Sequence, residues 1–263
     1  MAEAQIRFDD GESYERYMGD WSQRVGKAFL VWLSAPPGLK WIDVGCGNGA
    51  FTELLVERCA PAEVHGIDPS DAQLAFARKR PASRLAKFDR GDAMALPFPA
   101  HRFDAAVMAL VIFFVPDPGK GVAEMMRVVR PGGIVAAYAW DILGGGFTLE
   151  PLRIELRAMG VKPIDPPSVE ASRMEAMRDF WTKAGFSAVE TRQITVQRTF
   201  ANFDEFWSTT LSGAPSLRPT LASMSTSDIE LFKTRVRARL PADAAGRITY
   251  ESRANAVKGR VPD

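Results

Sequence analysis

A loop rich in glycine follows an aspartate and could bind a charged ligand. Asp43 lies in a short apolar run, and Gly45, Gly47 and Gly49 follow it at every second position. Glycine tolerates positive φ and has no Cβ, so a ligand can lie against the backbone at the start of a following helix. With Ala50, the spacing also fits the dinucleotide pattern G-x-G-x-x-G/A. Asp43 favours a ligand with an ammonium group over a dinucleotide, because a carboxylate attracts an ammonium group and repels a pyrophosphate.

Two further aspartates follow the next apolar runs. Asp68 closes the second run. Its separation from Gly49 along the sequence is the one at which an acid can accept hydrogen bonds from both ribose hydroxyls of an adenosine-containing cofactor. Its alternative role as a helix N-cap is better filled by Ser70. Asp92 follows the third run and could accept a hydrogen bond from the exocyclic amine of adenine, with Met94 covering the ring; the alternative is an ordinary turn aspartate.

The elements that must position these residues alternate between strand and helix. Short apolar runs predict strands at Lys40–Val44, Glu63–Ile67, Ala86–Arg90, Phe103–Ala109 and Ile134–Ala139. Helical patterns between them cover Ala50–Cys59, Ser70–Arg80 and Pro118–Val129. Such alternation predicts an α/β fold with a doubly wound, mostly parallel sheet covered on both faces. Two later strands, Ala188–Thr199 and Arg247–Lys258, are expected to pair with each other.

Taken together, these motifs resemble those of class I S-adenosylmethionine-dependent methyltransferases. Asp43 to Gly49 matches the family's first motif, Asp68 its second-strand acid and Asp92 its adenine-side acid. Leu96-Pro97-Phe98 and the turn from Arg127 to Gly133 are similar to the small-molecule subgroup that includes ubiquinone and menaquinone methyltransferases. The resemblance implies a Rossmann-like, seven-stranded sheet with an antiparallel last strand, and S-adenosyl-L-methionine as cofactor with S-adenosyl-L-homocysteine as product. The cofactor-binding residues it implies are Tyr17, Asp43, Gly45, Cys46, Gly47, Asp68, Pro69, Asp92, Ala93, Met94 and Ala109.

Length and patterning predict one domain over residues 1–263, because cores split only beyond roughly 250–300 residues. Its cofactor-binding core is expected at 40–140. The resemblance implies that a helix at 12–33 acts as a lid, with Tyr14, Tyr17 or Trp21 folding over the cofactor; the alternative is an aromatic stripe that packs against the core. Segments 141–169 and 200–240 interrupt the strand-helix rhythm and are expected to cover an acceptor site as helical insertions.

The expected acceptor is a small, apolar or aromatic molecule methylated by in-line displacement. Residues 109–114 are all apolar, whereas amino-methylating DNA enzymes carry an acid or Asn followed by Pro-Pro and an aromatic there. A net charge of +1 also argues against a nucleic-acid partner. No side chain stands out as a general base. Phe206 and Trp207 could serve as pocket walls or could instead anchor their helix to the core. The aromatic residues available as pocket walls are Phe113, Phe114, Trp140, Phe147, Phe206 and Trp207.

Two alternatives stay open at the level of sequence. The glycine spacing also suits an NAD(P)-dependent oxidoreductase, although no Tyr-x-x-x-Lys pair is present, and a cofactor-binding module without catalysis would carry the same motifs. Cys46 and Cys59 fit neither a disulfide framework nor a zinc site, so no metal is expected. The N-terminus has no secretory signal, and no apolar run reaches the ~18 residues of a membrane span, so we expect a cytoplasmic protein without a membrane partner.

Overall fold

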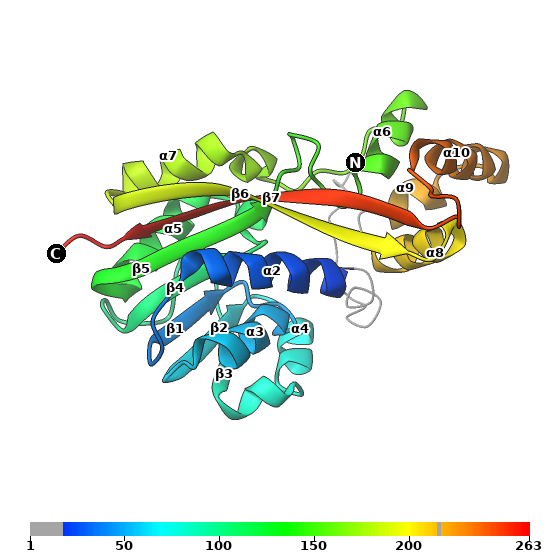
Figure 1. The fold of residues 1–263 in the computed structure, drawn as a ribbon. Coiled ribbons are helices and arrows are strands. Elements are labelled where there is room, and N and C mark those ends of the chain that lie inside the picture. Colours follow the sequence, from blue (N-terminus) through cyan, green and yellow to red (C-terminus); the bar gives the residue numbers. More distant parts are fainter. Residues whose placement is uncertain (1–17, 215–216) are drawn as a thin grey trace.

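The computed structural model describes residues 18–214 and 217–263, which build a seven-stranded sheet (Figure 1). The strand order is β3-β2-β1-β4-β5-β7-β6. Strands β1 to β5 pair in parallel, and β7 runs antiparallel to both β5 and β6. This topology confirms the doubly wound, mostly parallel sheet, its antiparallel last strand and the late strand pair. The strands are β1 (Lys40–Val44), β2 (Glu63–Asp68), β3 (Ala86–Arg90), β4 (Phe103–Ala109), β5 (Val129–Trp140), β6 (Ser187–Phe200) and β7 (Ile248–Arg260).

Helices cover both faces of the sheet. In Figure 1, α2, α3 and α4 lie in front of the sheet, and α5 and α7 lie behind it. Side-chain caps fix where several helices begin: Ser70 accepts a hydrogen bond from the N–H of Gln73 in α4, and Asp117 caps α5. None of the helices in the described ranges could cross a bilayer, by length and apolarity. The helices on the sheet are α2 (Asp20–Leu33), α3 (Ala50–Cys59), α4 (Asp71–Ala77), α5 (Pro118–Val128) and α7 (Met174–Ala184).

The strand β5 differs most from its predicted bounds, whereas β2, β6 and β7 differ by at most two residues at either end. The expected strand began at Ile134, but β5 begins at Val129, which pairs with Phe103 before the register shifts. Gly132, with φ +70°, lies in this irregular segment and lets the backbone resume regular pairing at Ile134. The Pro-Gly-Gly segment is therefore the bulged start of a strand and not a separate turn.

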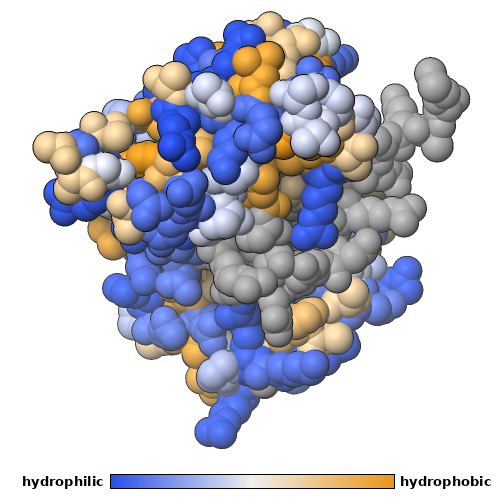
Figure 2. Space-filling model, turned by 90° about the vertical axis from the view of Figure 1, so that its right-hand side faces the viewer, coloured by the Kyte–Doolittle hydropathy of each residue, from blue (hydrophilic) through white to orange (hydrophobic). Residues whose placement is uncertain are grey.

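The two predicted insertions form one helical cap, which we define as α6 (Glu150–Ala158), α8 (Phe203–Gly213), α9 (Arg218–Ala222) and α10 (Thr226–Arg239). The helical cap lies at the end of the sheet where β6 finishes and β7 begins (Figure 1). Buried Glu155 of α6 joins two arginines of α10, at 2.8 Å from Nε of Arg235 and 2.6 Å from Arg239. Figure 2 views the molecule from this end, where hydrophobic and hydrophilic side chains are interspersed.

The N-terminal helix packs its aromatic stripe into the core. Trp21 and Phe29 of α2 are fully buried, and Trp21 meets Trp140 at 6.4 Å and Tyr250 at 5.2 Å between ring centroids. Trp21 therefore belongs to the core and not to a lid. Tyr14 and Tyr17 lie outside the described residues, so the lid assigned to 12–33 stays a prediction.

Candidate functional site

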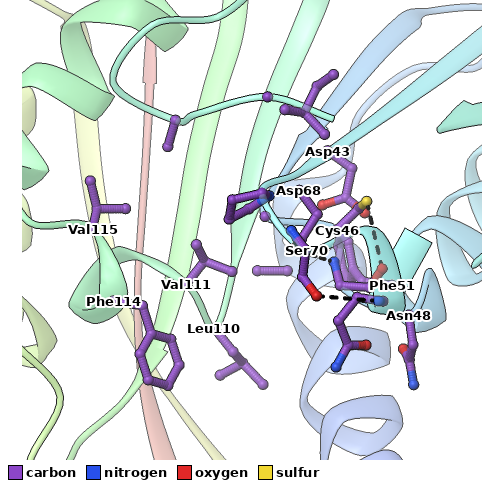
Figure 3. A pocket seen from close by; sticks show the side chains of 18 of the residues that line it. Asp43, Cys46, Asn48, Phe51, Asp68, Ser70, Leu110, Val111, Phe114 and Val115 are labelled. Carbon is purple, nitrogen blue, oxygen red and sulfur yellow. Dashed lines mark hydrogen bonds between the residues drawn. The ribbon is translucent and has the colours of Figure 1, made fainter. Parts of the chain in front are cut away.

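A cavity of about 430 Å³ lies at the carboxyl ends of β1, β2 and β4. In an open α/β sheet this edge is where ligands bind, and the volume is within the range of small-molecule sites. Figure 3 shows two unlike walls. The first carries the polar side chains of the loops after β1 and β2. The second is apolar and comes from the segment after β4.

The glycine loop builds the floor between these walls, and two of its glycines have different reasons to be glycine. Gly45 has φ +76°, and a Cβ on it would overlap the side chain of Val111. Gly47 has φ +53°, but apart from its two chain neighbours no described residue has a heavy atom within 4 Å of the position that a Cβ would take. Gly45 is therefore required for packing the two loops together. Gly47 leaves a stretch of backbone open to the cavity, where a ligand can approach it closely.

Asp68 lies at the end of β2 and joins two loops of the site. Its Oδ2 accepts a hydrogen bond of 2.9 Å from the N–H of Gly47, and its Oδ1 accepts one of 2.9 Å from the N–H of Ser70. Burial raises the pKa of Asp68, and these two hydrogen bonds oppose the rise. Each carboxylate oxygen has a second lone pair, so Asp68 can hold the loops and still accept hydrogen bonds from a ligand.

Asp43 is the most perturbed acid of the site. It borders the cavity from β1 but is itself fully buried. Its Oδ2 accepts a 2.6 Å hydrogen bond from the hydroxyl of Thr52 in α3, whereas Oδ1 has no hydrogen-bond partner within residues 18–214 and 217–263. Burial raises the pKa of Asp43 to about 7; the Thr52 hydrogen bond opposes this rise, and the charge of Asp68 adds to it. A buried carboxyl with one unpaired oxygen beside a cavity is typical of a site that binds a cationic group.

Cys46 borders the same cavity but has little nucleophilic character. Burial raises the pKa of its thiol well above the ordinary value, and the nearby carboxylates of Asp43 and Asp68 raise it further. The nucleophile in cysteine chemistry is the thiolate, which this setting disfavours. Cys46 therefore shapes the loop and supplies no reactive group.

The third acidic loop lies at the rim. Asp92 and Ala93 line the cavity, and Asp92 Oδ1 accepts a 2.8 Å hydrogen bond from the N–H of Met94. This is the turn geometry expected of an aspartate two residues before the donor. Met94 itself packs partly buried against the core and does not line the cavity. Pro69 and Ala109, which sequence analysis also assigned to the cofactor, do line it.

The apolar wall contains a strained residue. Leu110 directly follows β4 with φ +61°, a left-handed conformation that is uncommon for a residue with a side chain. Its N–H donates a 2.8 Å hydrogen bond to the carbonyl of Tyr138 on β5. This turn directs Val111 onto Gly45 and leaves Leu110 and Phe114 beside the cavity (Figure 3). Local strain of this kind is frequent at ligand sites.

The structure does not bring the predicted acceptor residues together. Phe114 lines the cavity, and Phe113 packs against Phe114 with 4.7 Å between the ring centroids. Phe206 is fully buried against Phe200, at 5.3 Å. The remaining three, Trp140, Phe147 and Trp207, meet Trp21, the Arg153 guanidinium and Phe203 respectively. Of the six, only Phe114 borders this cavity; the other five pack against neighbouring side chains of the fold.

Several cavity residues were not among the sequence predictions. Phe51 and Gln73 lie near the starts of α3 and α4, so their position after the two motifs is a signal that could have identified them. Tyr138 reaches the cavity from β5, a neighbour of β4 in the sheet, and Ser22 reaches it from α2. These two carry no local signal, because only the tertiary fold brings them to the site.

Several other polar and charged side chains have structural partners. His65 lies between the ring of Phe98 and the carboxylate of Glu63, whose oxygen is 2.7 Å from Nε2. Asp141 accepts a 3.1 Å hydrogen bond from the N–H of Gly144 in the loop after β5. Three arginines of α10 pair with acids of the helical cap. These groups hold the fold together.

Comparison with known proteins shows that part of the chain is similar to methyltransferases. Residues 42–137 match the family described as "Methyltransferase domain". The chain is 34% identical over 110 residues to demethylmenaquinone methyltransferase of Desulfitobacterium hafniense, covering 40% of this chain and 44% of that protein. It is 42% identical over 96 residues to 2-methyl-6-phytyl-1,4-hydroquinone methyltransferase 2 of Oryza sativa subsp. japonica, covering 36% and 28%. The chain thus spans less than half the length of these curated relatives.

Solved structures share the fold. The phosphoethanolamine N-methyltransferase 2 of Haemonchus contortus, in complex with S-adenosyl-L-methionine, superposes with a TM-score of 0.58 at 19% identity. The match covers 96% of this chain and 56% of that chain. At this identity the similarity establishes the fold, and the family match covers the strands that carry the glycine loop and the acidic residues. Residues 42–137 are therefore similar to a methyltransferase domain, on a fold shared with a solved methyltransferase.

Proposed function

We propose that this protein transfers a methyl group from S-adenosyl-L-methionine to a small, apolar or aromatic acceptor. The observation that carries the proposal is the division of one cavity into a polar wall and an apolar wall. The polar wall suits a ligand with a ribose and an ammonium group, and the apolar wall suits an acceptor that brings few charges. The curated relatives with quinone-type names support an acceptor of this class.

The residues of the polar wall fit the cofactor on two independent grounds. Gly47 offers open backbone where a side chain would intrude, and Asp43 has a buried oxygen without a partner. We assign Asp68 to the ribose hydroxyls, Asp43 to the charge of the α-ammonium group, and Asp92 with Ala93 to the adenine edge. When bound, S-adenosyl-L-methionine supplies an electrophilic methyl group on a sulfonium.

The chain's own contribution to the reaction is orientation and exclusion of water. Leu110, Val111 and Phe114 present hydrocarbon to the acceptor side of the cavity and so limit access of water. Holding two reactants in line can supply several kcal/mol of the acceleration, about 7 or more in favourable cases. The helical cap is proposed to complete the acceptor side, and the lid predicted at 12–33 is proposed to close over the cofactor. A nucleic-acid acceptor and a metal play no part in this proposal, and the cytoplasm stays the predicted compartment.

A nicotinamide-dependent oxidoreductase is disfavoured by the family match and by the charge of the site. A pyrophosphate at the glycine loop would face Asp43 and Asp68, and like charges at close range in a partly buried site cost several kcal/mol. The test is calorimetric titration with S-adenosyl-L-homocysteine and, separately, with NADH. We expect binding of the first only. Binding of NADH alone would overturn the proposal.

Turnover separates an enzyme from a binding module that lacks catalysis. The protein would be incubated with methyl-labelled S-adenosyl-L-methionine and a panel of hydroquinones, phenols and sterols, with transfer of label into the organic phase as readout. We expect label in at least one hydroquinone or phenol. Tight binding of the cofactor product without transfer to any class of acceptor would favour the module.

A further inference from the structure

Thr52 is a buried polar residue with no role in the proposed function described above. It lies in the first turns of α3, directly after the glycine loop, and is fully buried. Its hydroxyl donates a 2.6 Å hydrogen bond to Oδ2 of Asp43 across the strand-to-helix junction. The bond is at the short end of the O–H···O range, as expected when the acceptor is an ionised carboxylate.

The hydrogen bond leaves the two oxygens of Asp43 in unequal states. Oδ2 accepts a hydrogen bond from Thr52, and Oδ1 has no partner in the described part of the chain although it is buried. An unpaired buried oxygen is costly for the protein alone, so its retention beside a cavity points to a ligand that supplies the missing charge. A neutral hydrogen-bond donor already occupies Oδ2, and the cation must therefore be provided from the cavity side.

We propose that Thr52 is a positioning residue of the cofactor site: it fixes Asp43 in its ionised form, so that the carboxylate attracts the α-ammonium group of the cofactor. The proposal rests on the function proposed above. Thr52 is not among the described residues that line the cavity, so it would act on the cofactor through Asp43. Cofactor affinity should then depend on the protonation of Asp43, and Thr52 should set the pH at which affinity is lost.

The surrounding groups define what else could titrate. The cavity is also lined by the carboxyls of Asp68 and Asp92, the thiol of Cys46 and the phenol of Tyr138. Asp68 raises the pKa of Asp43 through its charge, and the high pKa of Cys46 keeps that thiol protonated. The Thr52 hydroxyl bonds to none of these four and bonds to Asp43, so a change at Thr52 reports on Asp43.

The sign of the effect follows from the need for an ionised carboxylate. Since the pKa of Asp43 is about 7, affinity for S-adenosyl-L-homocysteine should weaken about tenfold between about pH 8 and pH 6. Removing the Thr52 hydroxyl removes a bond that favours the charged form, which should raise the pKa by about one unit. Affinity should then fall about fivefold at neutral pH and hardly at all near pH 8.5.

The experiment is calorimetric titration of S-adenosyl-L-homocysteine into the wild type, Thr52→Val, Thr52→Ser and Asp43→Asn between about pH 6 and 8.5. Val has nearly the shape of Thr and removes only the hydroxyl, and Ser restores it. We expect the midpoint of the affinity profile to move upward by about one pH unit in Thr52→Val and to return in Thr52→Ser. Asp43→Asn should bind weakly with a nearly flat profile.

The outcomes separate this inference from the proposed function. If the wild type binds and Thr52→Val keeps the wild-type midpoint, Thr52 has only a structural role and the inference is wrong. An equal loss of affinity at every pH, without rescue by Ser, leads to the same conclusion. If the wild type fails to bind S-adenosyl-L-homocysteine at any pH, the proposed function itself fails. Thermal melting of each variant identifies those that no longer fold.

Discussion

The polar wall of the cavity and the helical cap both contain buried acids, but the two regions use them differently. In the polar wall, Asp43 keeps one oxygen without a partner, and no basic side chain lines the cavity among the described residues. In the helical cap, Glu155 receives two arginines from α10. Burial of a carboxylate is unfavourable in both places. In the helical cap, the two arginines offset the cost of burying the carboxylate. In the polar wall, a bound ligand would offset that cost.

The pKa shifts of the two acids express this difference. Burial raises the pKa of Asp43 to about 7. Burial also works against ionisation of Glu155, but hydrogen bonds from Arg239 and Arg235 outweigh it and hold the pKa of Glu155 below its ordinary value. An unsatisfied acid next to a cavity therefore indicates binding, and a doubly paired acid between helices indicates docking of those helices. Substitutions in each region should separate ligand affinity from stability.

The largest effect on affinity is expected from Gly47→Val. The new side chain would project into the open space beside the loop backbone, where the cofactor is proposed to lie, and it would do so at φ +53°. We expect affinity for S-adenosyl-L-homocysteine to fall by roughly a thousandfold or more, beyond ~4 kcal/mol. Calorimetry measures this loss.

Gly160→Val is a matched control from the turn that follows α6. Gly160 also has a positive φ, +76°, and also has no heavy atom within 4 Å of the position of a Cβ. The two variants therefore carry a similar backbone strain, of order 1–3 kcal/mol in stability, but only one of them meets the ligand. Affinity lost equally in both variants would mean that strain alone explains the effect, and unchanged affinity in Gly47→Val would place the ligand elsewhere.

The next largest effect is expected from Asp68→Ala. Two charge-assisted hydrogen bonds to the ribose hydroxyls would be lost, which should weaken binding by roughly 2–4 kcal/mol, or ~30- to 1000-fold. The structure adds a second reason, because Asp68 also accepts from the N–H groups of Gly47 and Ser70. The loops it joins would lose this link.

Asp68→Asn keeps the size and one acceptor oxygen, so it separates the two reasons. A loss in Asn much smaller than in Ala indicates that the geometry of the loops matters most, and equal losses indicate that the charge matters most. Wild-type affinity in a folded Asp68→Ala protein would show that this residue does not hold the ribose.

Much of the polar wall could be predicted from sequence because its chemistry is local. Asp43, Gly45 and Gly47 follow one another in a single loop, and Asp68 follows at a spacing fixed by one strand-helix-strand unit. The main chain itself makes this site, so the required residue types appear at fixed intervals. The same reasoning predicted the doubly wound sheet and the bounds of β1, β3 and β4.

The apolar wall and the helical cap could not be predicted in this way. Phe206 and Trp207 looked like pocket walls, yet their rings pack on Phe200 and Phe203, and sequence cannot tell which side of an aromatic helix faces a ligand. The position of Leu110 depends on a left-handed turn that nothing in the residue type signals. Tyr138 becomes a cavity residue only because β5 lies beside β4.

A smaller effect is expected from Asp43→Asn on the stability of the protein without ligand. The pKa of Asp43 is about 7 in the folded protein, against 3.8 as its ordinary value. Between these values the folded state binds a proton that the unfolded state releases, so the unfolding free energy falls as pH rises. The slope from this one group is at most about 1.4 kcal/mol per pH unit.

Asn cannot ionise and removes that slope. The unfolding free energy of Asp43→Asn minus that of the wild type should therefore increase by about 2 kcal/mol between about pH 5 and pH 7, as measured by urea denaturation without ligand. Other titrating groups cancel in the difference. A constant difference over this range would show that Asp43 does not carry a raised pKa.

The smallest effect, and one confined to stability, is expected from Glu155→Gln in the helical cap. Removing one partner of a fully buried ion pair costs about 3–5 kcal/mol, but the two arginine side chains are 39% and 42% exposed, so water can solvate them and we expect about 1–2 kcal/mol. Because the folded pKa of Glu155 is depressed, its contribution is present above the ordinary pKa of 4.5 and disappears as pH falls through the folded value. The variant should therefore be less stable than the wild type at neutral pH, and the stabilities of the two proteins should converge in acid.

Affinity for S-adenosyl-L-homocysteine at neutral pH should stay within about twofold of the wild type, because Glu155 lies in the cap and does not line the cavity. A loss of affinity larger than the loss of stability would show that the cap and the polar wall are coupled, and the contrast between the two regions would no longer hold.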